Sequence, residues 1–211
     1  MRSALHWVFA GFVLIGGCGT SDSPIKGQSK TPKPTPPKKI LLAPKVQMVV
    51  YDFDQTLPVI HVFHKTRGAR EVSQLDDAFF VEAFGGPERI SRLKKHFGKL
   101  SKNGTTCLIV SYGFTDVIKE SLERVGLADY FDNANIHGRD SASLTRHRGA
   151  KHKLIAEEMS KRNFSKDQVI FVDDDLRNIE ACIEAKICRT MHVAKRSGLT
   201  ELQLDTLEKL K

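Results

Sequence analysis

The stretch VVYDFDQTL at residues 49–57 starts as a continuous apolar run and ends in two acids separated by a single residue. An unbroken run rich in β-branched residues is typical of a strand that is buried on both faces of a parallel sheet. Two later runs have the same design, because LIVS at 108–111 and VIFVDDD at 169–175 also pass from apolar to polar residues. We therefore expect parallel strands whose polar ends meet at the edge of the sheet where α/β proteins bind ligands.

Segments with helical spacing of apolar residues separate these strands, and a capping box from Thr200 to Gln203 predicts a helix near the end of the chain. No internal repeat is evident. The alternation predicts an α/β fold with a doubly wound parallel sheet. We expect strands at 46–53, 106–110, 135–137, 168–172 and 187–193, and helices at 88–100, 115–125, 151–162 and 177–185.

The basic character of the chain is concentrated at its beginning. The 211 residues carry a formal net charge of +8, and 40% of them are hydrophobic, enough for one folded domain. Residues 1–45 hold seven Lys or Arg and one acid, whereas residues 46–211 hold 26 basic and 24 acidic residues. The body is therefore nearly balanced, and we expect no specific binding of nucleic acid by it.

The first 44 residues are typical of a targeting segment followed by a linker. Residues 1–17 combine Arg2 with a short apolar run, as in a secretory signal peptide. The sequence IGGC at 15–18 resembles the lipobox of bacterial lipoproteins, in which the cysteine is acylated. Residues 18–44 are rich in Pro and Lys and predict an extended linker before a folded domain at 45–211.

We therefore expect an exported protein, tethered to a membrane if Cys18 is acylated. An ordinary cleaved signal peptide and a cytoplasmic protein with a misassigned start remain as alternatives. The other cysteines, Cys107, Cys182 and Cys188, lack CxxC spacing, so neither a zinc site nor a dithiol motif is indicated. A Cys182–Cys188 bridge could form in an exported protein, although we expect buried free thiols.

Acidic side chains accumulate at the predicted strand ends. Like charges so close together are unfavourable unless a cation lies among them. Ligands that offer only oxygen favour a hard ion, and Mg²⁺ held by a few carboxylates fits best. One carboxylate could then attack phosphorus while a second manages the proton of the leaving group, and a hydroxyl and a lysine would offset phosphoryl charge. This reasoning predicts metal-assisted phosphoryl transfer at the end of the sheet where five acids gather, namely Asp52, Asp54, Asp173, Asp174 and Asp175.

Together these features resemble the four motifs of the haloacid dehalogenase (HAD) superfamily. The segment DFDQT at 52–56, Ser111, a downstream lysine and a DD pair at 173–174 followed by Asn178 occur in the order of those motifs. The resemblance spans residues 49–178, most of the expected folded body. It implies a HAD-like Rossmannoid fold and, since an acid stands second in the first motif, phosphatase rather than dehalogenase activity.

The resemblance also implies individual roles. Asp52 would be the nucleophile that forms an aspartyl-phosphate, and Asp54 the general acid and base. Thr56 would support the loop and the phosphate site, and Ser111 would hydrogen-bond the phosphoryl oxygens. The phosphate-binding lysine would be Lys151, 22 residues before Asp173, or Lys153, 20 residues before it. The small capless magnesium-dependent phosphatases of the superfamily, which this segment resembles, favour Lys151.

For the metal, the resemblance implies that Asp52, Asp174 and the backbone carbonyl of Asp54 hold Mg²⁺, with Asp173 as a direct or water-mediated neighbour. Asn178 would orient these acids or the lysine. We interpret Asp175 as the N-cap of the helix that follows. For His61 and His64 we favour a surface or packing role over a place at the substrate entrance.

The segment between the first and second motifs is short, so the site is expected to have no cap or a minimal one. By analogy with the family, an open site suits phosphoproteins, nucleic-acid ends or sugar phosphates presented by something larger. The expected partner is a phosphorylated substrate, either a small molecule or a phosphoprotein. The basic stretch at 139–153 could bind a second phosphate, or it could be an exposed loop. Two other functions stay open: a phosphotransferase that uses an acceptor other than water, and a catalytically idle phosphate-binding module. The sequence does not predict the oligomeric state.

Overall fold

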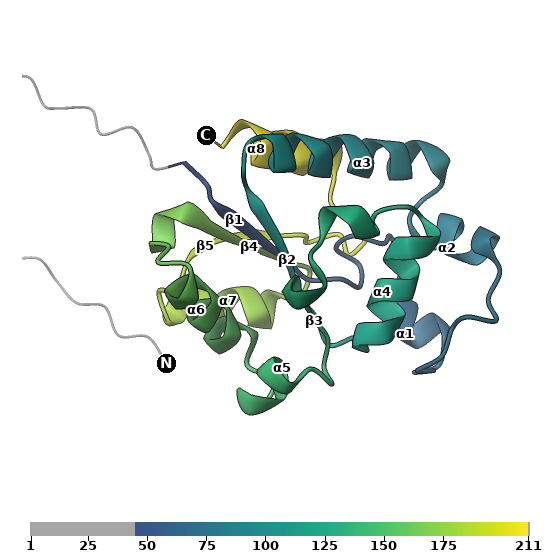
Figure 1. Cartoon of the computed structure of the whole chain (residues 1–211), viewed down its shortest axis with the longest axis horizontal. Coiled ribbons are helices and arrows are strands. Elements are labelled where there is room, and N and C mark those ends of the chain that lie inside the picture. The colour runs from purple at the N-terminus through teal and green to yellow at the C-terminus, as the bar shows by residue number, and fades with distance from the viewer. Residues whose placement is uncertain (1–44, 211) are drawn as a thin grey trace, which may run out of the picture. The chain divides into compact units, whose positions relative to one another are not determined.

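The structure, a computed structural model, describes residues 45–210 (Figure 1). The predicted signal peptide, the predicted acylation site Cys18 and the predicted linker at 18–44 lie outside these residues. Among the helices within 45–210, none is long and apolar enough to cross a membrane.

A five-stranded sheet forms the centre of the described body, and every neighbouring pair of strands is parallel (Figure 1). The strand order is β3-β2-β1-β4-β5, so the first strand lies in the middle. The chain therefore extends the sheet in one direction from β1 and later returns to extend it in the other, as the doubly wound prediction requires. The strands are β1 (Met48–Tyr51), β2 (Thr106–Val110), β3 (Ile136–His137), β4 (Val169–Asp173) and β5 (Arg189–His192).

Helices cover both faces of this sheet. Successive residues of β1 point to opposite faces, so each face needs helices to bury its apolar side chains. Val49 and Tyr51 belong to one buried cluster with α3, α4 and α8, whereas Met48 and Val50 belong to a second with α6 and α7. The helices are α1 (Val62–Lys65), α2 (Asp77–Ala83), α3 (Pro87–Lys102), α4 (Thr115–Arg124), α5 (Ala142–Arg146), α6 (Lys151–Lys161), α7 (Leu176–Glu184) and α8 (Glu201–Lys209), and three short 3-10 turns, η1 (Ala128–Tyr130), η2 (Asn133–Asn135) and η3 (Lys166–Gln168), join them.

The expected strands and long helices are confirmed, with ends that shift by one to a few residues. Two predicted caps are confirmed as well. Asp175 accepts a hydrogen bond from the backbone N–H of Arg177 at 3.0 Å, and Thr200 and Gln203 form the capping box that begins α8. Strand β4 continues one residue further than predicted, so Asp173 pairs with His192 of β5 in the sheet.

Three short helices are not predicted by the sequence: α1, α2 and α5. Each has seven residues or fewer, too few to display a helical period. Residues 52–105, all of them described, contain only α1, α2 and α3 and no strand. The segment is therefore too simple to build a separate cap domain, in agreement with the expected capless or minimally capped fold.

Candidate active site

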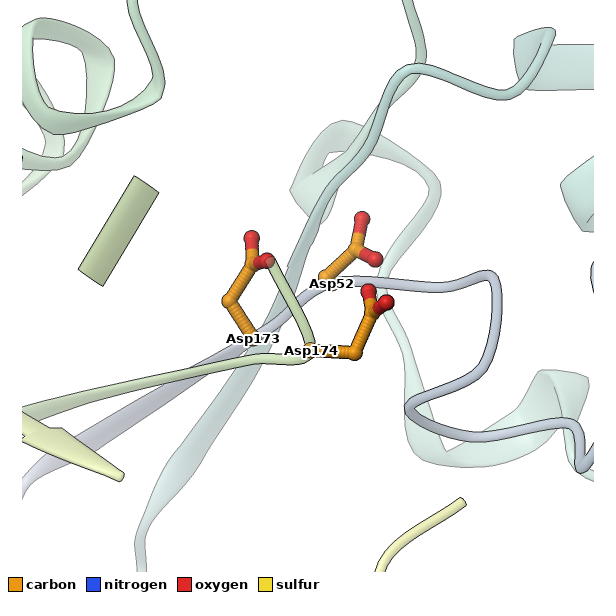
Figure 2. Close-up of side chains that lie close together, drawn as sticks. All are labelled: Asp52, Asp173 and Asp174. Atoms are coloured by element: carbon orange, nitrogen blue, oxygen red, sulfur yellow. The ribbon is translucent and has the colours of Figure 1, made fainter. Parts of the chain in front are cut away.

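Three aspartates meet where β1 and β4 end (Figure 2). Tyr51 of β1 lies opposite Val172 of β4, so the residues that follow these strands emerge side by side. The side chains of Asp52, Asp173 and Asp174 are buried, and each offers a carboxylate oxygen within 4.8 Å of the others. The parallel register thus brings together residues that are more than 100 positions apart in the chain.

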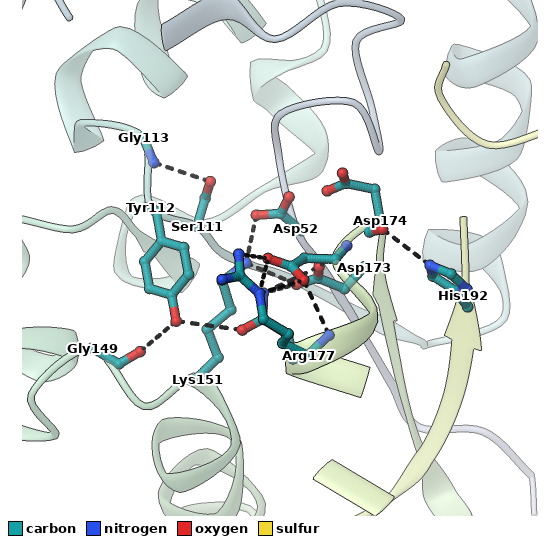
Figure 3. Close-up of polar contacts among 12 residues, drawn as sticks. Asp52, Ser111, Tyr112, Gly113, Gly149, Lys151, Asp173, Asp174, Arg177 and His192 are labelled. Atoms are coloured by element: carbon teal, nitrogen blue, oxygen red, sulfur yellow. Dashed lines mark hydrogen bonds and ion pairs between the residues drawn. The ribbon is translucent and has the colours of Figure 1, made fainter. Parts of the chain in front are cut away.

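Lys151 joins two of these acids (Figure 3). Its Nζ donates to Asp52 Oδ1 at 2.7 Å and to Asp173 Oδ2 at 2.8 Å. Only 3% of Lys151 is exposed. Burial by itself would lower the pKa of this ammonium group, but the two carboxylates outweigh burial and raise the pKa. Lys151, the first residue of α6, therefore reaches the acids as a permanent cation, whereas Lys153 is exposed.

The acids carry more negative charge than Lys151 balances. Burial raises the pKa of Asp52, Asp173 and Asp174, and the charges of neighbouring aspartates raise these values further. Lys151 acts in the opposite direction on all three. Since all three groups still titrate above their ordinary range, the cluster favours a further positive charge among its oxygens. The donor set, which is carboxylate oxygen only, fits a hard divalent cation.

Asp173 is held more firmly than its neighbours. Its carboxylate accepts from the backbone N–H of Asp175 at 2.7 Å and from Asn178 Nδ2 at 3.2 and 3.1 Å, in addition to Lys151. These bonds occupy both of its oxygens. The geometry therefore makes Asp52 and Asp174 the more available ligands. Asn178 contacts Asp173, and its orienting role stays a prediction.

Asp54 is held by the start of α1. One carboxylate oxygen accepts from the backbone N–H of Val62 at 2.6 Å and of Phe63 at 3.4 Å, and Nδ1 of His61 lies 3.2 Å from the other oxygen. Hydrogen bonding to Asp54 raises the pKa of His61. The surface or packing role predicted for His61 does not include this contact with Asp54. Nothing in the sequence around His61 signals it, because α1 is only four residues long.

Ser111 and Tyr112 follow β2 and face the same acids from the other side (Figure 3). Ser111 is buried, and its Oγ accepts from the backbone N–H of Gly113 at 3.2 Å. Tyr112 places its ring centroid 4.7 Å from Lys151 Nζ and donates its hydroxyl to the carbonyl of Gly149 at 2.9 Å. The ring of Tyr112 thus covers the lysine, a contact that the sequence does not predict.

Thr56 does not contact the acids through its hydroxyl. Its Oγ1 is buried and has no hydrogen-bond partner among residues 45–210. Its backbone N–H donates to the carbonyl of Phe53 at 3.1 Å, and its carbonyl accepts from Leu199 at 2.9 Å. The loop-supporting part of the prediction matches these backbone bonds, whereas phosphate binding by Thr56 stays a prediction.

A cavity of about 250 Å³ opens beside Asp173 and Asp174. Within the basic stretch at 139–153, Lys151 contacts the acids, whereas Arg146 and His147 pair with Glu157 at 2.8 and 2.6 Å. Binding of a second phosphate by this stretch stays a prediction. Other side chains, some of them not predicted for the site, form the cavity wall: Gln55, His61, His64, Tyr112, Asp173, Asp174, Asp175, Arg177, Asn178 and Arg196.

A model of the haloacid dehalogenase-like hydrolase family matches residues 86–192, about half of the chain. The chain belongs to the haloacid dehalogenase-like hydrolase family. The matched segment contains five of the predicted site residues, Ser111, Lys151, Asp173, Asp174 and Asn178. Asp52 and Asp54 precede this segment, and Asp52 lies against Lys151, Asp173 and Asp174 in the structure. No curated protein matches the chain.

Solved structures of similar proteins share low sequence identity with this hydrolase. A predicted phosphatase from Clostridium acetobutylicum is 18% identical, with 78% of this chain and 91% of that chain covered and a TM-score of 0.46. A haloacid dehalogenase-like family protein from Streptococcus pneumoniae is 13% identical, covering 77% and 90%, with a TM-score of 0.43. A HAD-superfamily hydrolase from Ehrlichia chaffeensis is 16% identical, covering 70% and 87%, with a TM-score of 0.42.

Proposed function

We propose that this hydrolase is a Mg²⁺-dependent phosphatase that cleaves phosphate monoesters through an aspartyl-phosphate on Asp52. The observation that carries the proposal is the buried cluster of Asp52, Asp173 and Asp174 with Lys151 between two of its members. A nucleophilic carboxylate, a fixed cation and spare acidic ligands are the groups that metal-assisted phosphoryl transfer needs. Bound among these acids, Mg²⁺ would supply positive charge that offsets the substrate phosphate.

In the first step, a carboxylate oxygen of Asp52 attacks phosphorus and the bond from phosphorus to the leaving oxygen breaks. Asp54, protonated at that moment, gives its proton to the leaving oxygen, so that an alcohol departs. Lys151 holds the carboxylate of Asp52 in place through the 2.7 Å bond to Oδ1. We assign Ser111, buried beside the acids, to hydrogen-bonding of the phosphoryl oxygens.

In the second step, Asp54 takes a proton from water, and the oxygen of that water attacks the phosphorus of the aspartyl-phosphate. The bond to Asp52 breaks, which releases inorganic phosphate and restores both carboxyl groups. The backbone N–H groups at the start of α1 keep Asp54 in one position through both steps. One water is consumed, and one alcohol and one phosphate are formed in each turnover.

The test is hydrolysis of p-nitrophenyl phosphate by the full chain with Mg²⁺ and with EDTA. We expect turnover only with Mg²⁺ and its loss in Asp52→Asn. Asp175→Asn is the matched control, because it removes a neighbouring negative charge while asparagine still caps α7. Activity that survives in Asp52→Asn would rule out the aspartyl-phosphate. Phosphate binding without turnover would instead indicate an idle binding module. Transfer of the phosphoryl group to an added alcohol would indicate a phosphotransferase.

We further propose that the substrate is a phosphorylated small molecule or phosphoprotein and that the protein is exported, with Cys18 as the site of acylation. The open cavity beside Asp173 and Asp174 supports access by a substrate of either size. The export proposal rests on residues 1–44 of the sequence. Mass spectrometry of the N-terminus tests it: an intact Met1 contradicts export, and a peptide that starts at an acylated Cys18 supports the tether.

A further inference from the structure

Two loops at the rim of the cavity are hydrogen-bonded to each other. Gln55 follows Asp54, and Arg196 follows β5; both have a left-handed backbone, with φ of 58° and 52°. Gln55 Nε2 donates to the carbonyl of Arg196 at 2.9 Å, and Gly198 donates its N–H to the carbonyl of Gln55 at 3.0 Å. Residues other than glycine adopt this backbone only when their surroundings hold them in it. The backbone of Arg196 is therefore fixed at the rim.

The side chain of Arg196 is anchored less firmly than its backbone. Its Nε lies 3.3 Å from Oδ2 of Asp174, and 53% of the side chain is exposed. Within residues 45–210 this is the only ion pair of Arg196. Lys151, by contrast, is buried and bonded to two acids. The guanidinium of Arg196 can therefore separate from Asp174 and remain in contact with solvent.

A divalent cation among the acids would compete with Arg196 for Asp174, because both use the same carboxylate. Once displaced, the guanidinium would stand at the mouth of the cavity without an acid to pair with. Arg177, the other arginine of the rim, is already bound to Asp175 on its own helix, with a shortest contact of 2.6 Å. An unpaired guanidinium at the entrance of a site attracts an anionic group and can bind it through two hydrogen bonds.

We propose that Arg196 is a specificity-determining residue that exchanges Asp174 for a second anionic group on the substrate. The substrate class is then a phosphate monoester that carries another negative group, such as a carboxylate, beyond the phosphate that is removed. This inference rests on the proposed phosphatase function, since the phosphate being hydrolysed lies at Asp52. It adds a part of the site that the four sequence motifs do not contain.

The kinetic test compares two probes of nearly equal shape, 4-carboxyphenyl phosphate and its neutral isostere 4-carbamoylphenyl phosphate, on the full chain with Mg²⁺. We expect kcat/KM to favour the charged probe by about 10-fold, mainly through KM, as for a charge-assisted hydrogen bond. In Arg196→Gln the ratio of the two values should fall to near one. Arg196→Lys should retain part of the preference.

Lys195→Gln is the matched control, because it removes one positive charge from the next, exposed residue of the same loop. The preference for the charged probe should persist in it. Loss of the preference in both variants would show a general effect of loop charge and overturn the assignment to Arg196. Equal kcat/KM for the two probes in the wild-type chain would also overturn it, while leaving the proposed phosphatase function intact.

Calorimetric titration with Mg²⁺ alone tests the exchange without turnover. Arg196→Gln should bind Mg²⁺ several-fold more tightly than the wild-type chain, because no guanidinium competes for Asp174, whereas Lys195→Gln should change the affinity less. Unchanged affinity in Arg196→Gln would contradict the exchange. If the wild-type chain hydrolyses neither probe nor p-nitrophenyl phosphate, the proposed function fails and the substrate preference fails with it. The calorimetric result would then still decide whether Arg196 competes for Asp174.

Discussion

Lys151 shows how one residue can determine both the stability and the chemistry of the site. Its ammonium group lies between two buried carboxylates, at 2.7 and 2.8 Å. Removal of one partner of a buried ion pair leaves the other charges without compensation, and such changes cost more than the loss of a surface pair. The lysine therefore matters even before a substrate arrives.

We predict that Lys151→Ala lowers the free energy of unfolding by about 3–5 kcal/mol in the absence of divalent cation. Lys153→Ala, two residues away and exposed, should change it by less than about 1 kcal/mol. Urea denaturation followed by circular dichroism measures both values. Equal effects of the two substitutions would mean that the buried ion pairs of Lys151 stabilise the folded chain no more than an exposed lysine on the same helix does.

Asp54 has a separate part in the proposed reaction, because it moves protons while Asp52 forms the bond to phosphorus. Asparagine at this position can still accept the hydrogen bond from Val62 but cannot take a proton from water. We predict that Asp54→Asn lowers kcat by about 100-fold or more and that the phosphorylated enzyme accumulates. Intact-protein mass spectrometry after mixing with p-nitrophenyl phosphate should show one added phosphoryl group. A variant that stays unmodified and turns over normally would exclude Asp54 as the general base.

At the scale of elements, a polar chain connects β1 with α3 and α8 on the face that carries Tyr51. The hydroxyl of Tyr51 lies 2.8 Å from Nε2 of His96, and Nδ1 of His96 lies 3.1 Å from Glu208. His96 is fully buried. Arg92 and Lys99 of α3 also pair with Glu208, at 2.6 and 2.7 Å. The carboxylate thus joins two helices, and the imidazole joins them to the sheet.

This chain predicts a loss of stability on mild acidification. Burial lowers the pKa of His96 from 6.5 to about 4, although Glu208 acts against this shift. Between these two values the unfolded chain binds a proton that the folded chain does not, so stability falls as the pH falls through that window. The contribution of His96 is about 3 kcal/mol over the window, at 1.36 kcal/mol for each pKa unit.

The variant that tests this prediction is His96→Gln, which keeps polar atoms in the same place but does not titrate. Urea unfolding measured from pH 7 down to pH 4 should show a flatter decline for the variant than for the wild-type chain. Glu208, whose pKa its basic neighbours lower to about 2 despite burial, remains charged in the folded wild-type chain throughout this window. If the two proteins lose stability in parallel, the acid sensitivity comes from other groups.

At the scale of the whole molecule, the acids of the site predict that a bound cation stabilises the folded body. Folding brings three carboxylates within 4.8 Å of one another, and the unfolded chain has no such cluster. A ligand that binds only the folded state stabilises it, by about 2.7 kcal/mol at a concentration 100 times its Kd. We predict that saturating Mg²⁺ raises the Tm by several degrees.

Differential scanning calorimetry of the full chain, with and without Mg²⁺, measures this shift. Asp174→Asn should lose most of it, because that residue is an available ligand and Lys151 does not hold it. Asp175→Asn should keep it, since Asp175 caps α7 and pairs with Arg177. An equal shift in both variants would place the cation away from the predicted cluster.

Much of this architecture follows from local patterns in the sequence. Apolar runs that end in acids predict buried parallel strands, and helical spacing predicts the long helices between them, because both signals depend on residues that are close in the chain. The candidate site residues at the strand ends follow from the same runs, since the carboxyl ends of parallel strands share one edge. The resemblance to the HAD motifs favours Lys151 over Lys153 but leaves both open, and only the structure shows Lys151 against the acids and Lys153 exposed.

The tertiary structure alone decides the strand order and the contacts that complete the site. His61 meets Asp54, Tyr112 covers Lys151, and Arg196 pairs with Asp174. Each of these contacts depends on where a loop or a four-residue helix ends in space. Such segments have no periodic pattern, because few of their side chains must face a core. The sequence by itself thus determines which strand ends carry the acids, and long-range packing determines which side chains surround them.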